Sequence, residues 1–216
     1  MDELFQRILL VVVAYVVGSI PFGVIIARVS GGPDPRSVGS GRTGGTNALR
    51  ALGRRWAALV VAGDLAKGAL PVLLARYATN GDALAEVLAA GAAVFGASHS
   101  IFLGLRGGRG VGTGVGTMLI IQPVAVVLAA PVFFLVILLT RYVSLGSLIG
   151  SAAMFPAMLL IWAVAAGAVA PAYLAWAAVG PVLIWIAHAD NIDRLRRGTE
   201  RKFDLNLLGG RRSGGA

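Results

Sequence analysis

The chain has no cysteine and only two histidines, so several kinds of chemistry lack their usual residues. Without cysteine there is no disulfide, no thiolate metal ligand and no cysteine nucleophile. The ten aspartates and glutamates are scattered along 216 residues and form no cluster with the histidines. We therefore expect neither a metal centre nor a cofactor.

Charge is also scarce, since 13% of residues are charged, 57% are hydrophobic and the mean hydropathy is +0.80. A soluble domain could hardly keep so much apolar surface out of water, and several apolar runs approach the length that crosses a bilayer. The first run, 4–27, is too long for a signal-peptide core and follows two acids rather than a basic region, so we expect it to stay as a helix. The composition predicts an all-α integral membrane protein.

Seven apolar segments are separated by clusters of glycine, proline, asparagine or arginine, which predicts seven transmembrane helices. Residues 111–140 could instead form one long helix, because two helices in about 30 residues would each span only about 22 Å. Pro123 marks the plausible turn between the two. The segments are 4–27, 56–77, 83–103, 111–122, 124–140, 145–166 and 171–188.

The distribution of charge favours seven crossings. With seven, 16 of the 19 lysines and arginines fall on one side, Arg141 among them, and four acids fall on the other. The positive-inside rule then places the N-terminus outside and the C-terminus in the cytoplasm. A single helix over 111–140 would separate Arg141 and the basic tail from the first two basic loops. We expect one seven-helix membrane domain, 1–203, and a flexible cytoplasmic tail, 204–216.

Three stretches rich in glycine or arginine interrupt the apolar pattern, namely Gly39–Arg50, Arg106–Gly112 and Asn191–Lys202. Glycine lets backbone N–H groups approach an anion closely, and arginine supplies a fixed cation. With seven crossings, all three stretches lie at the cytoplasmic surface. They therefore predict a single phosphate-binding site.

The first two stretches also have plainer interpretations. Thr46 and Asn47 could cap the helix that follows them, and glycine loops are common. Arg106 and Arg109 could simply keep a short loop on the cytoplasmic side of the membrane, as the positive-inside rule describes. That interpretation leaves the four glycines of the second stretch unexplained. The second stretch does not match the Walker A pattern GxxxxGK[ST].

The third stretch begins where the last apolar segment ends. His188 and Asn191 would share one face of a continuing helix, whereas Arg194 drifts off that face. An interfacial histidine and arginines that contact lipid headgroups are the plainer interpretation.

Polar residues near or within the apolar segments allow two further expectations. Asp64 and Lys67 lie one turn apart. The role that this spacing favours is an intrahelical ion pair or a snorkelling lysine, and support of the phosphate site ranks after it. Ser144 and Ser147 would lie at the cytoplasmic start of the sixth crossing. They could contact a ligand there, or they could serve as small residues that let helices pack closely. The chain has no Ser-His-Asp order and no GxSxG sequence, so covalent serine catalysis has little support.

Five segments carry a resemblance to a known family: Gly18–Gly23, Gly39–Arg50, Ser100–Thr113, Thr140–Ser147 and His188–Lys202. In this order and at this spacing they closely resemble the bacterial acyl-phosphate:glycerol-3-phosphate acyltransferases, the PlsY family. The resemblance runs from about residue 4 to residue 202.

The resemblance implies a multi-pass enzyme of the bacterial plasma (inner) membrane whose active site faces the cytoplasm. It would transfer a fatty acyl group from acyl phosphate to the 1-hydroxyl of glycerol 3-phosphate, giving lysophosphatidate and inorganic phosphate, the first acylation of phospholipid synthesis. The implied partners are these substrates and membrane lipid, with no nucleic acid, no metal and no obligatory protein partner. Acyl phosphate is already activated, so cations and amides that orient two dianions are needed more than a nucleophile.

The resemblance also assigns residues. The acyl-phosphate head would be held by Gly39, Ser40, Gly41, Gly44, Thr46, Asn47, Gly107, Gly108 and Gly110. Glycerol 3-phosphate would be held by Arg50, Arg109, Ser147, His188 and Asn191. The residues expected to act in catalysis are Ser40, Arg50, Arg109, His188 and Asn191.

The chain departs from the family's pattern at a few positions. The family usually has histidine after the glycine that corresponds to Gly96, but this chain has Ala97, with His99 two residues later. Arg42 stands where asparagine is common, and Gly45 replaces the usual alanine. Arginines 106 and 109 stand where lysine is frequent, and their bidentate forks can change substrate affinity.

Two other functions compete with the enzyme. A transporter of small anions would place its motifs near the bilayer centre on inverted repeats, and the sequence indicates neither feature. A non-catalytic subunit that binds anionic lipid heads would need arginines, but it would not need the Gly-Ser-Gly and Thr-Asn sequences.

Overall fold

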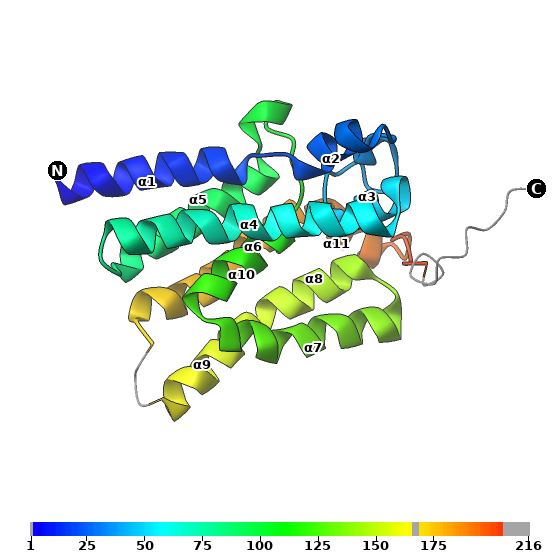
Figure 1. The fold of residues 1–216 in the computed structure, drawn as a ribbon. Helices are drawn as coiled ribbons and strands as arrows, with labels where there is room; N and C mark the ends of the chain where they lie inside the picture. The colour runs from blue at the N-terminus through cyan, green and yellow to red at the C-terminus, as the bar shows by residue number, and fades with distance from the viewer. Residues whose placement is uncertain (1, 166–168, 205–216) are drawn as a thin grey trace, which may run out of the picture.

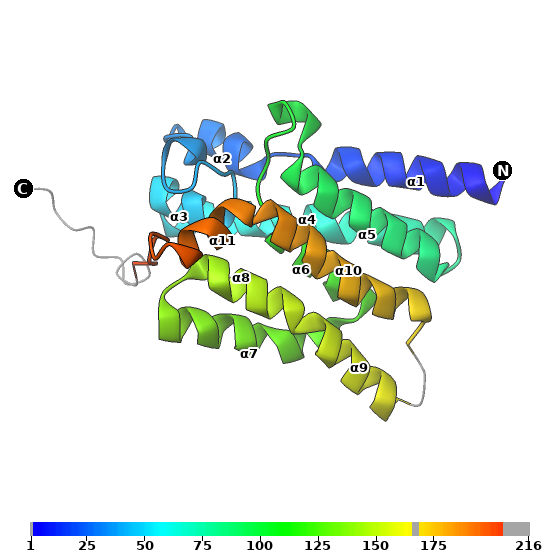
Figure 2. The same ribbon diagram turned by 180° about the vertical axis from the view of Figure 1, so that it is seen from behind.

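The computed structural model describes residues 2–165 and 169–204, and over these residues it consists of helices and connecting segments with no strand (Figures 1 and 2). The α-helices are α1 (Glu3–Gly18), α2 (Phe22–Ser30), α3 (Gly45–Leu52), α4 (Arg54–Ala78), α5 (Ala83–Ser98), α6 (Val111–Ile121), α7 (Pro123–Thr140), α8 (Val143–Ala152), α9 (Met154–Val164), α10 (Pro171–Ala187) and α11 (Ala189–Arg196). Two short 3-10 helices are η1 (Pro35–Ser37) and η2 (Ile101–Leu103). The all-α fold class is confirmed for these residues. The expected tail lies outside them from residue 205 onward.

The longer helices form a bundle, with the N-terminus at one end and α3 and α11 at the other (Figure 1). Within the described part of the chain, five segments are long and apolar enough to cross a membrane, and α10 with α11, bent by 69°, would be a sixth. The five are Glu3–Ser30, Arg54–Ala78, Ala83–Leu103, Pro123–Thr140 and Val143–Val164. The expected crossing at 111–122 corresponds to α6, which has only 11 residues. The count of seven therefore remains a prediction.

Helix α6 is short because it begins part-way along the bundle. Its N-terminal half packs directly on α4, where a Cβ added at Gly68 would lie 2.0 Å from the carbonyl oxygen of Thr113. Gly112 faces Asp64, about ten residues and so about 15 Å along α4 from its first residue. The end of the loop before α6, at Gly107, Gly108 and Gly110, is thus buried among the helices, whereas Arg106 earlier in the loop is exposed.

The first span is broken between α1 and α2, around Ile20. A helix break within a membrane leaves backbone carbonyls without partners unless side chains supply donors. Ser100 donates its hydroxyl to the Ser19 carbonyl at 2.6 Å, and Lys67 donates to the Ile20 carbonyl at 3.1 Å. Lys67 also lies 2.7 Å from Asp64, which confirms the predicted intrahelical pair.

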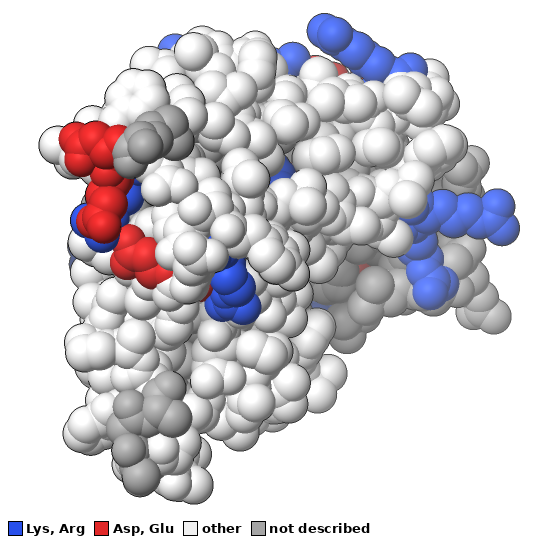
Figure 3. Space-filling model, turned by 60° about the vertical axis from the view of Figure 1, so that its left-hand side comes forward, with Lys and Arg blue, Asp and Glu red and all other residues white. Residues whose placement is uncertain are grey.

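Charged side chains divide between the two ends of the bundle. Near the N-terminus, Arg7 lies 2.8 Å from Asp82 and 3.8 Å from Glu3, and Figure 3 shows acidic side chains gathered on this side. Most arginines belong to α3, α11 and the loops at the opposite end. This separation agrees with the expected charge asymmetry, whereas the orientation in a membrane remains a prediction.

Candidate active site

All three glycine- and arginine-rich stretches line one polar cavity of about 420 Å³. Residues from α4, α5, α7 and α8 also line it. Of the residues predicted to form the site, those that line the cavity are Ser40, Gly44, Thr46, Asn47, Arg50, Gly108, Arg109, Gly110, Ser147, His188 and Asn191. The structure therefore brings together segments that are more than a hundred residues apart in the sequence.

Asn47 organises the first stretch. Its side chain is 3% exposed, and its amide donates to the Ser40 hydroxyl at 3.1 Å and to the Arg42 carbonyl at 2.9 Å. Its carbonyl oxygen accepts from the Arg50 guanidinium at 3.0 Å and from the Ser40 backbone N–H at 3.4 Å. Asn47 lies in the first turn of α3 and does not cap it, since the N-cap is Gly44, which has no side-chain bond. The loop is thus closed onto the helix that follows it.

The second stretch offers an anion site at the start of α6. Gly110 is the N-cap with φ 74°, and the first main-chain bond of the helix is donated by Gly114 to Gly110 at 2.7 Å. The preceding N–H groups, on Val111, Gly112 and Thr113, have no helical acceptor, and these three residues line the cavity. A helix N-terminus with free N–H groups favours negative charge.

Gly107 and Gly108 act differently from what the sequence suggested. Their N–H groups donate to the carbonyls of Ser98 at 2.9 Å and Ala97 at 2.8 Å, so neither amide is free for a substrate. A Cβ at Gly107 would lie 2.3 Å from the Ala97 carbonyl oxygen. These glycines let the loop lie directly on the end of α5, which fixes the position of Arg109.

Arg109 connects the second stretch to the first and to Asp190, the residue just before the third. One guanidinium nitrogen donates to the Ser40 hydroxyl at 3.3 Å, and the other donates to Asp190 at 3.1 Å. Burial lowers the pKa of Arg109, and the like charges of Arg42 and Arg194 lower it further. Its Nε is buried without a partner, so this N–H group is available to a ligand oxygen.

Ser40 is arranged as a donor to a ligand. Its hydroxyl oxygen already accepts from Asn47 and Arg109. No described residue accepts its proton, so no base activates it as a nucleophile.

Ser147 also lines the cavity, although its hydroxyl donates to the Val143 carbonyl at 2.9 Å. The arrangement agrees with the absence of a serine triad from the sequence.

His188 and Asn191 lie at the 69° bend between α10 and α11, each 2% exposed. The Nδ1 atom of His188 is 2.8 Å from the Ile184 carbonyl oxygen. A carbonyl only accepts, so Nδ1 carries the proton and Nε2 of the neutral ring can accept from a hydroxyl. Asn191 donates to Glu200, and its carbonyl oxygen is buried without a partner. Both side chains therefore offer acceptors suited to a substrate hydroxyl.

Two acids that sequence reasoning missed hold this end of the site. Asp190 accepts from Arg109 and Arg194, each at 3.1 Å. Glu200 accepts from Ser144, Asn191 and Arg194 at 2.6 to 2.8 Å. Burial acts to raise the pKa of Glu200, but these hydrogen bonds outweigh it and the pKa is lowered. The spacing of Asp190 and Arg194 by four residues was a usable signal for one of them.

Three predicted residues do not line the cavity: Gly39, Gly41 and Gly107. At Gly39, with φ 58°, a Cβ would lie 2.4 Å from the side-chain oxygen of Asn47, so glycine is needed there for the Asn47 contacts. His99 stacks on Phe95 with ring centroids 4.5 Å apart and does not line the cavity, whereas Ala97 does. His99 therefore does not replace the histidine that the family usually has at position 97.

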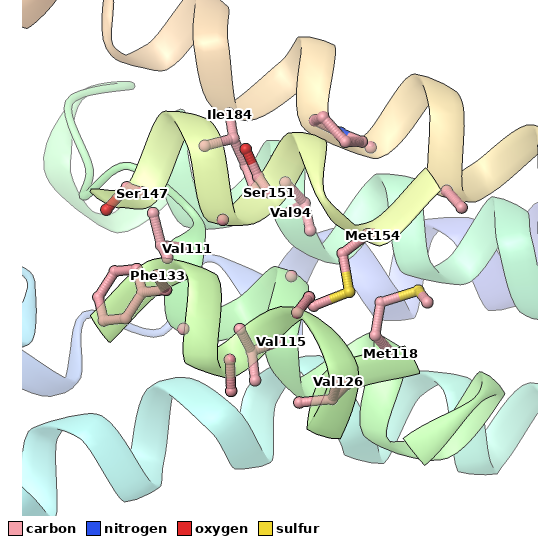
Figure 4. Close-up of a pocket in the computed structure, with 18 of the residues that line it drawn as sticks. Val94, Val111, Val115, Met118, Val126, Phe133, Ser147, Ser151, Met154 and Ile184 are labelled. Carbon is pink, nitrogen blue, oxygen red and sulfur yellow. The ribbon is translucent and has the colours of Figure 1, made fainter. Parts of the chain in front are cut away.

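An apolar groove of about 290 Å³ adjoins the polar cavity (Figure 4). The two share Val61, Val111, Gly112, Phe133, Phe134 and Ser147 in their linings. Further from the cavity, the groove is lined by Met118, Val126, Met154 and Trp176. A ligand with a charged head and a hydrocarbon chain can occupy both.

Comparisons with known proteins agree with this geometry. A family model described as glycerol-3-phosphate acyltransferase matches residues 8–198. The chain is 43% identical over 201 residues to a glycerol-3-phosphate acyltransferase of Geobacter sulfurreducens, covering 93% of this chain and 99% of that protein. It is 42% identical over 194 residues to a glycerol-3-phosphate acyltransferase of Thermus thermophilus, covering 88% of this chain and 92% of that protein.

The fold is similar to crystal structures of PlsY (YgiH), an integral membrane glycerol 3-phosphate acyltransferase. Its glycerol 3-phosphate form matches with a TM-score of 0.84 at 33% identity, covering 95% of this chain and 100% of that one. Its lysophosphatidic acid form matches with a TM-score of 0.83 at 34% identity, covering 94% and 99%. The helical arrangement is therefore shared over nearly the whole chain.

Proposed function

Because the chain belongs to the glycerol-3-phosphate acyltransferase family, we propose that it transfers a fatty acyl group from acyl phosphate to the 1-hydroxyl of glycerol 3-phosphate. The products are lysophosphatidate and inorganic phosphate. The chain is thus an acyltransferase of phospholipid synthesis and an integral membrane protein. Acyl phosphate as donor is what the resemblance to this family implies, and the geometry of the site supports it.

One observation carries the choice of donor: a cationic cavity opens directly into an apolar groove. Acyl phosphate has one phosphoryl group at the reacting end of its chain, so its head and tail fit these two compartments. The acyl carbonyl would then lie where they meet, near Val111, Phe133 and Ser147. The site needs no separate surface for a large carrier such as coenzyme A.

The residues divide into two phosphate subsites. The acyl-phosphate head is assigned to the first loop and to the free N–H groups at the start of α6, with Ser40 and Thr46 as side-chain contacts and Asn47 holding Ser40 in position. Glycerol 3-phosphate is assigned to Arg50, Arg109, Ser147, His188 and Asn191. Cations and oriented N–H groups placed in a recessed cavity stabilise charge more strongly than they would in water.

The reaction needs no enzyme nucleophile. The 1-hydroxyl oxygen forms a bond to the acyl carbon, and the bond between that carbon and the phosphate oxygen breaks. The hydroxyl proton goes to the departing phosphate, while Nε2 of His188 and the carbonyl oxygen of Asn191 orient the hydroxyl. Two substrates held side by side make the step effectively unimolecular. This substrate-assisted route agrees with the lack of a base beside Ser40.

The donor is tested with purified protein, glycerol 3-phosphate and palmitoyl phosphate. We expect release of inorganic phosphate and formation of lysophosphatidate, and no product with palmitoyl-CoA in the matched control, because the cavity is built for a phosphoryl head. Thin-layer or mass-spectrometric detection of lysophosphatidate is the measurement. Activity with palmitoyl-CoA and none with palmitoyl phosphate would overturn the choice of donor.

The proposed topology has seven crossings, with the N-terminus outside and the active site facing the cytoplasm. The cysteine-free chain makes single-cysteine labelling clean. Ala78→Cys and Ser37→Cys are conservative changes at exposed positions. A membrane-impermeant maleimide added to spheroplasts should modify the first variant at once and the second only after lysis. The reverse pattern would contradict the orientation.

A further inference from the structure

Arg42 is a half-buried arginine without an acidic partner. It lines the polar cavity, and its one side-chain hydrogen bond is donated to the Gly107 carbonyl at 3.5 Å. No carboxylate of the described residues lies within ion-pair distance of it, whereas Arg109 has one such partner and Arg194 has two. A guanidinium withdrawn from water without a counter-charge is costly. Among the described residues no acid pairs with Arg42, so we expect a bound substrate to supply the anion.

The acids that line the cavity are already engaged. Asp64 pairs with Lys67 at 2.7 Å, and Glu200 is held by three donors. The charge of Arg42 contributes to lowering the pKa of Arg109, and it also contributes to lowering the pKa of Asp190, a carboxylate that Arg109 and Arg194 already hold. Like charges at close range repel one another unless an anion lies between them.

The surroundings of Arg42 indicate which anion this is. Its side chain reaches the loop that precedes α6, and a Cβ at neighbouring Gly108 would lie 3.4 Å from the Thr43 hydroxyl. The Arg42 carbonyl is fixed by Asn47 at 2.9 Å, so the residue is held at the junction of the first two loops. The free N–H groups of α6, which we assign to the acyl-phosphate head, line the same cavity as Arg42.

We propose that Arg42 binds the phosphate of the acyl donor and stabilises it as it departs. This role rests on the proposed donor, acyl phosphate. The departing phosphate gains negative charge as its bond to the acyl carbon breaks, so a guanidinium beside it contributes most when that bond is nearly broken. Arg42 is thereby a third substrate arginine, alongside the two that serve glycerol 3-phosphate.

The test compares Arg42→Ala and Arg42→Lys with Arg36→Ala as the matched control. Arg36 is exposed on the same connecting segment and pairs with Asp34 outside the cavity. Loss of a charge-assisted contact predicts that Arg42→Ala lowers kcat/KM for palmitoyl phosphate by about tenfold to a hundredfold. The KM for glycerol 3-phosphate should stay within about twofold, Arg42→Lys should recover part of the loss, and Arg36→Ala should match the unaltered protein.

A second readout is inorganic phosphate binding by calorimetry at saturating glycerol 3-phosphate, which we expect Arg42→Ala to weaken by a similar factor. Unchanged donor kinetics in Arg42→Ala, or a rise confined to the KM for glycerol 3-phosphate, would overturn the role. Equal losses for both substrates with no recovery by lysine would also overturn it, because they indicate a disordered loop. If the unaltered protein is inactive with palmitoyl phosphate, the proposed function fails. The role of Arg42 is overturned separately if Arg42→Ala leaves the binding of inorganic phosphate unchanged.

Discussion

Arg109→Ala is expected to lower kcat/KM for glycerol 3-phosphate by about 10²- to 10³-fold. The substitution removes a buried guanidinium that reaches both Ser40 and Asp190, and it removes the free Nε–H that we assign to the substrate phosphate. Each hydrogen bond to a charged group contributes about 1.5–3 kcal/mol, and about 1.4 kcal/mol corresponds to tenfold in rate. Asp190 would also keep only Arg194 as a partner. Steady-state kinetics at saturating acyl phosphate measure the effect.

Arg106 provides the matched control for Arg109. It lies three residues earlier on the same loop, is exposed and does not line the cavity. Arg106→Ala should leave kcat/KM within about twofold, since an exposed arginine contributes little. Arg109→Lys should fall between the unaltered protein and Arg109→Ala, because lysine keeps the charge but not the planar fork. Equal effects of the two alanine substitutions would show that loop charge matters and that the Arg109 contacts do not.

The meeting of the three stretches could be predicted from the sequence because charge and hydropathy act at long range. A bilayer forces every basic loop to one side or the other, so counting arginines places distant segments at the same end of the bundle. Glycine at positions such as 110, where φ is 74°, then shows where the backbone turns toward a ligand.

Depth in the bundle could not be predicted in this way. The 11 residues of α6 are too few to span a bilayer, but nothing in their hydropathy shows that the helix begins about 15 Å along α4. That position results from close contact at Gly68 and Gly112, which sequence reasoning could not distinguish from other helix-packing glycines. Tertiary packing therefore decides how far the site is recessed.

The acids of the site were missed for an electrostatic reason. A cavity for two anions was expected to contain cations and amides, so Asp190 and Glu200 were not considered as parts of it. Arginines that approach this closely need counter-charges before a substrate arrives, and these two carboxylates supply them. Hydrogen bonds from neighbouring side chains hold Glu200 in its charged form.

Gly107→Ala is expected to abolish most of the activity without changing any group that touches a substrate. The new Cβ would lie 2.3 Å from the Ala97 carbonyl oxygen, so the loop would have to lift away from α5. That shift would break the bonds from the two loop amides to α5 and move Arg109 with them. A misplacement of about 1 Å can cost about a hundredfold in rate. Overpacking of this kind also destabilises by about 1–3 kcal/mol, which thermal unfolding in detergent can measure.

The control for Gly107 is Gly91→Ala, in the middle of α5. There the nearest atom to an added Cβ is a Trp176 ring carbon at 3.7 Å, an ordinary contact, so activity and thermal stability should be preserved. The comparison separates close approach of the loop from a general sensitivity of α5 to added methyl groups. If Gly107→Ala keeps full activity, the loop tolerates a shift and the position of Arg109 is not set by its contact with α5. If both variants lose activity equally, the effect belongs to the helix rather than to the loop.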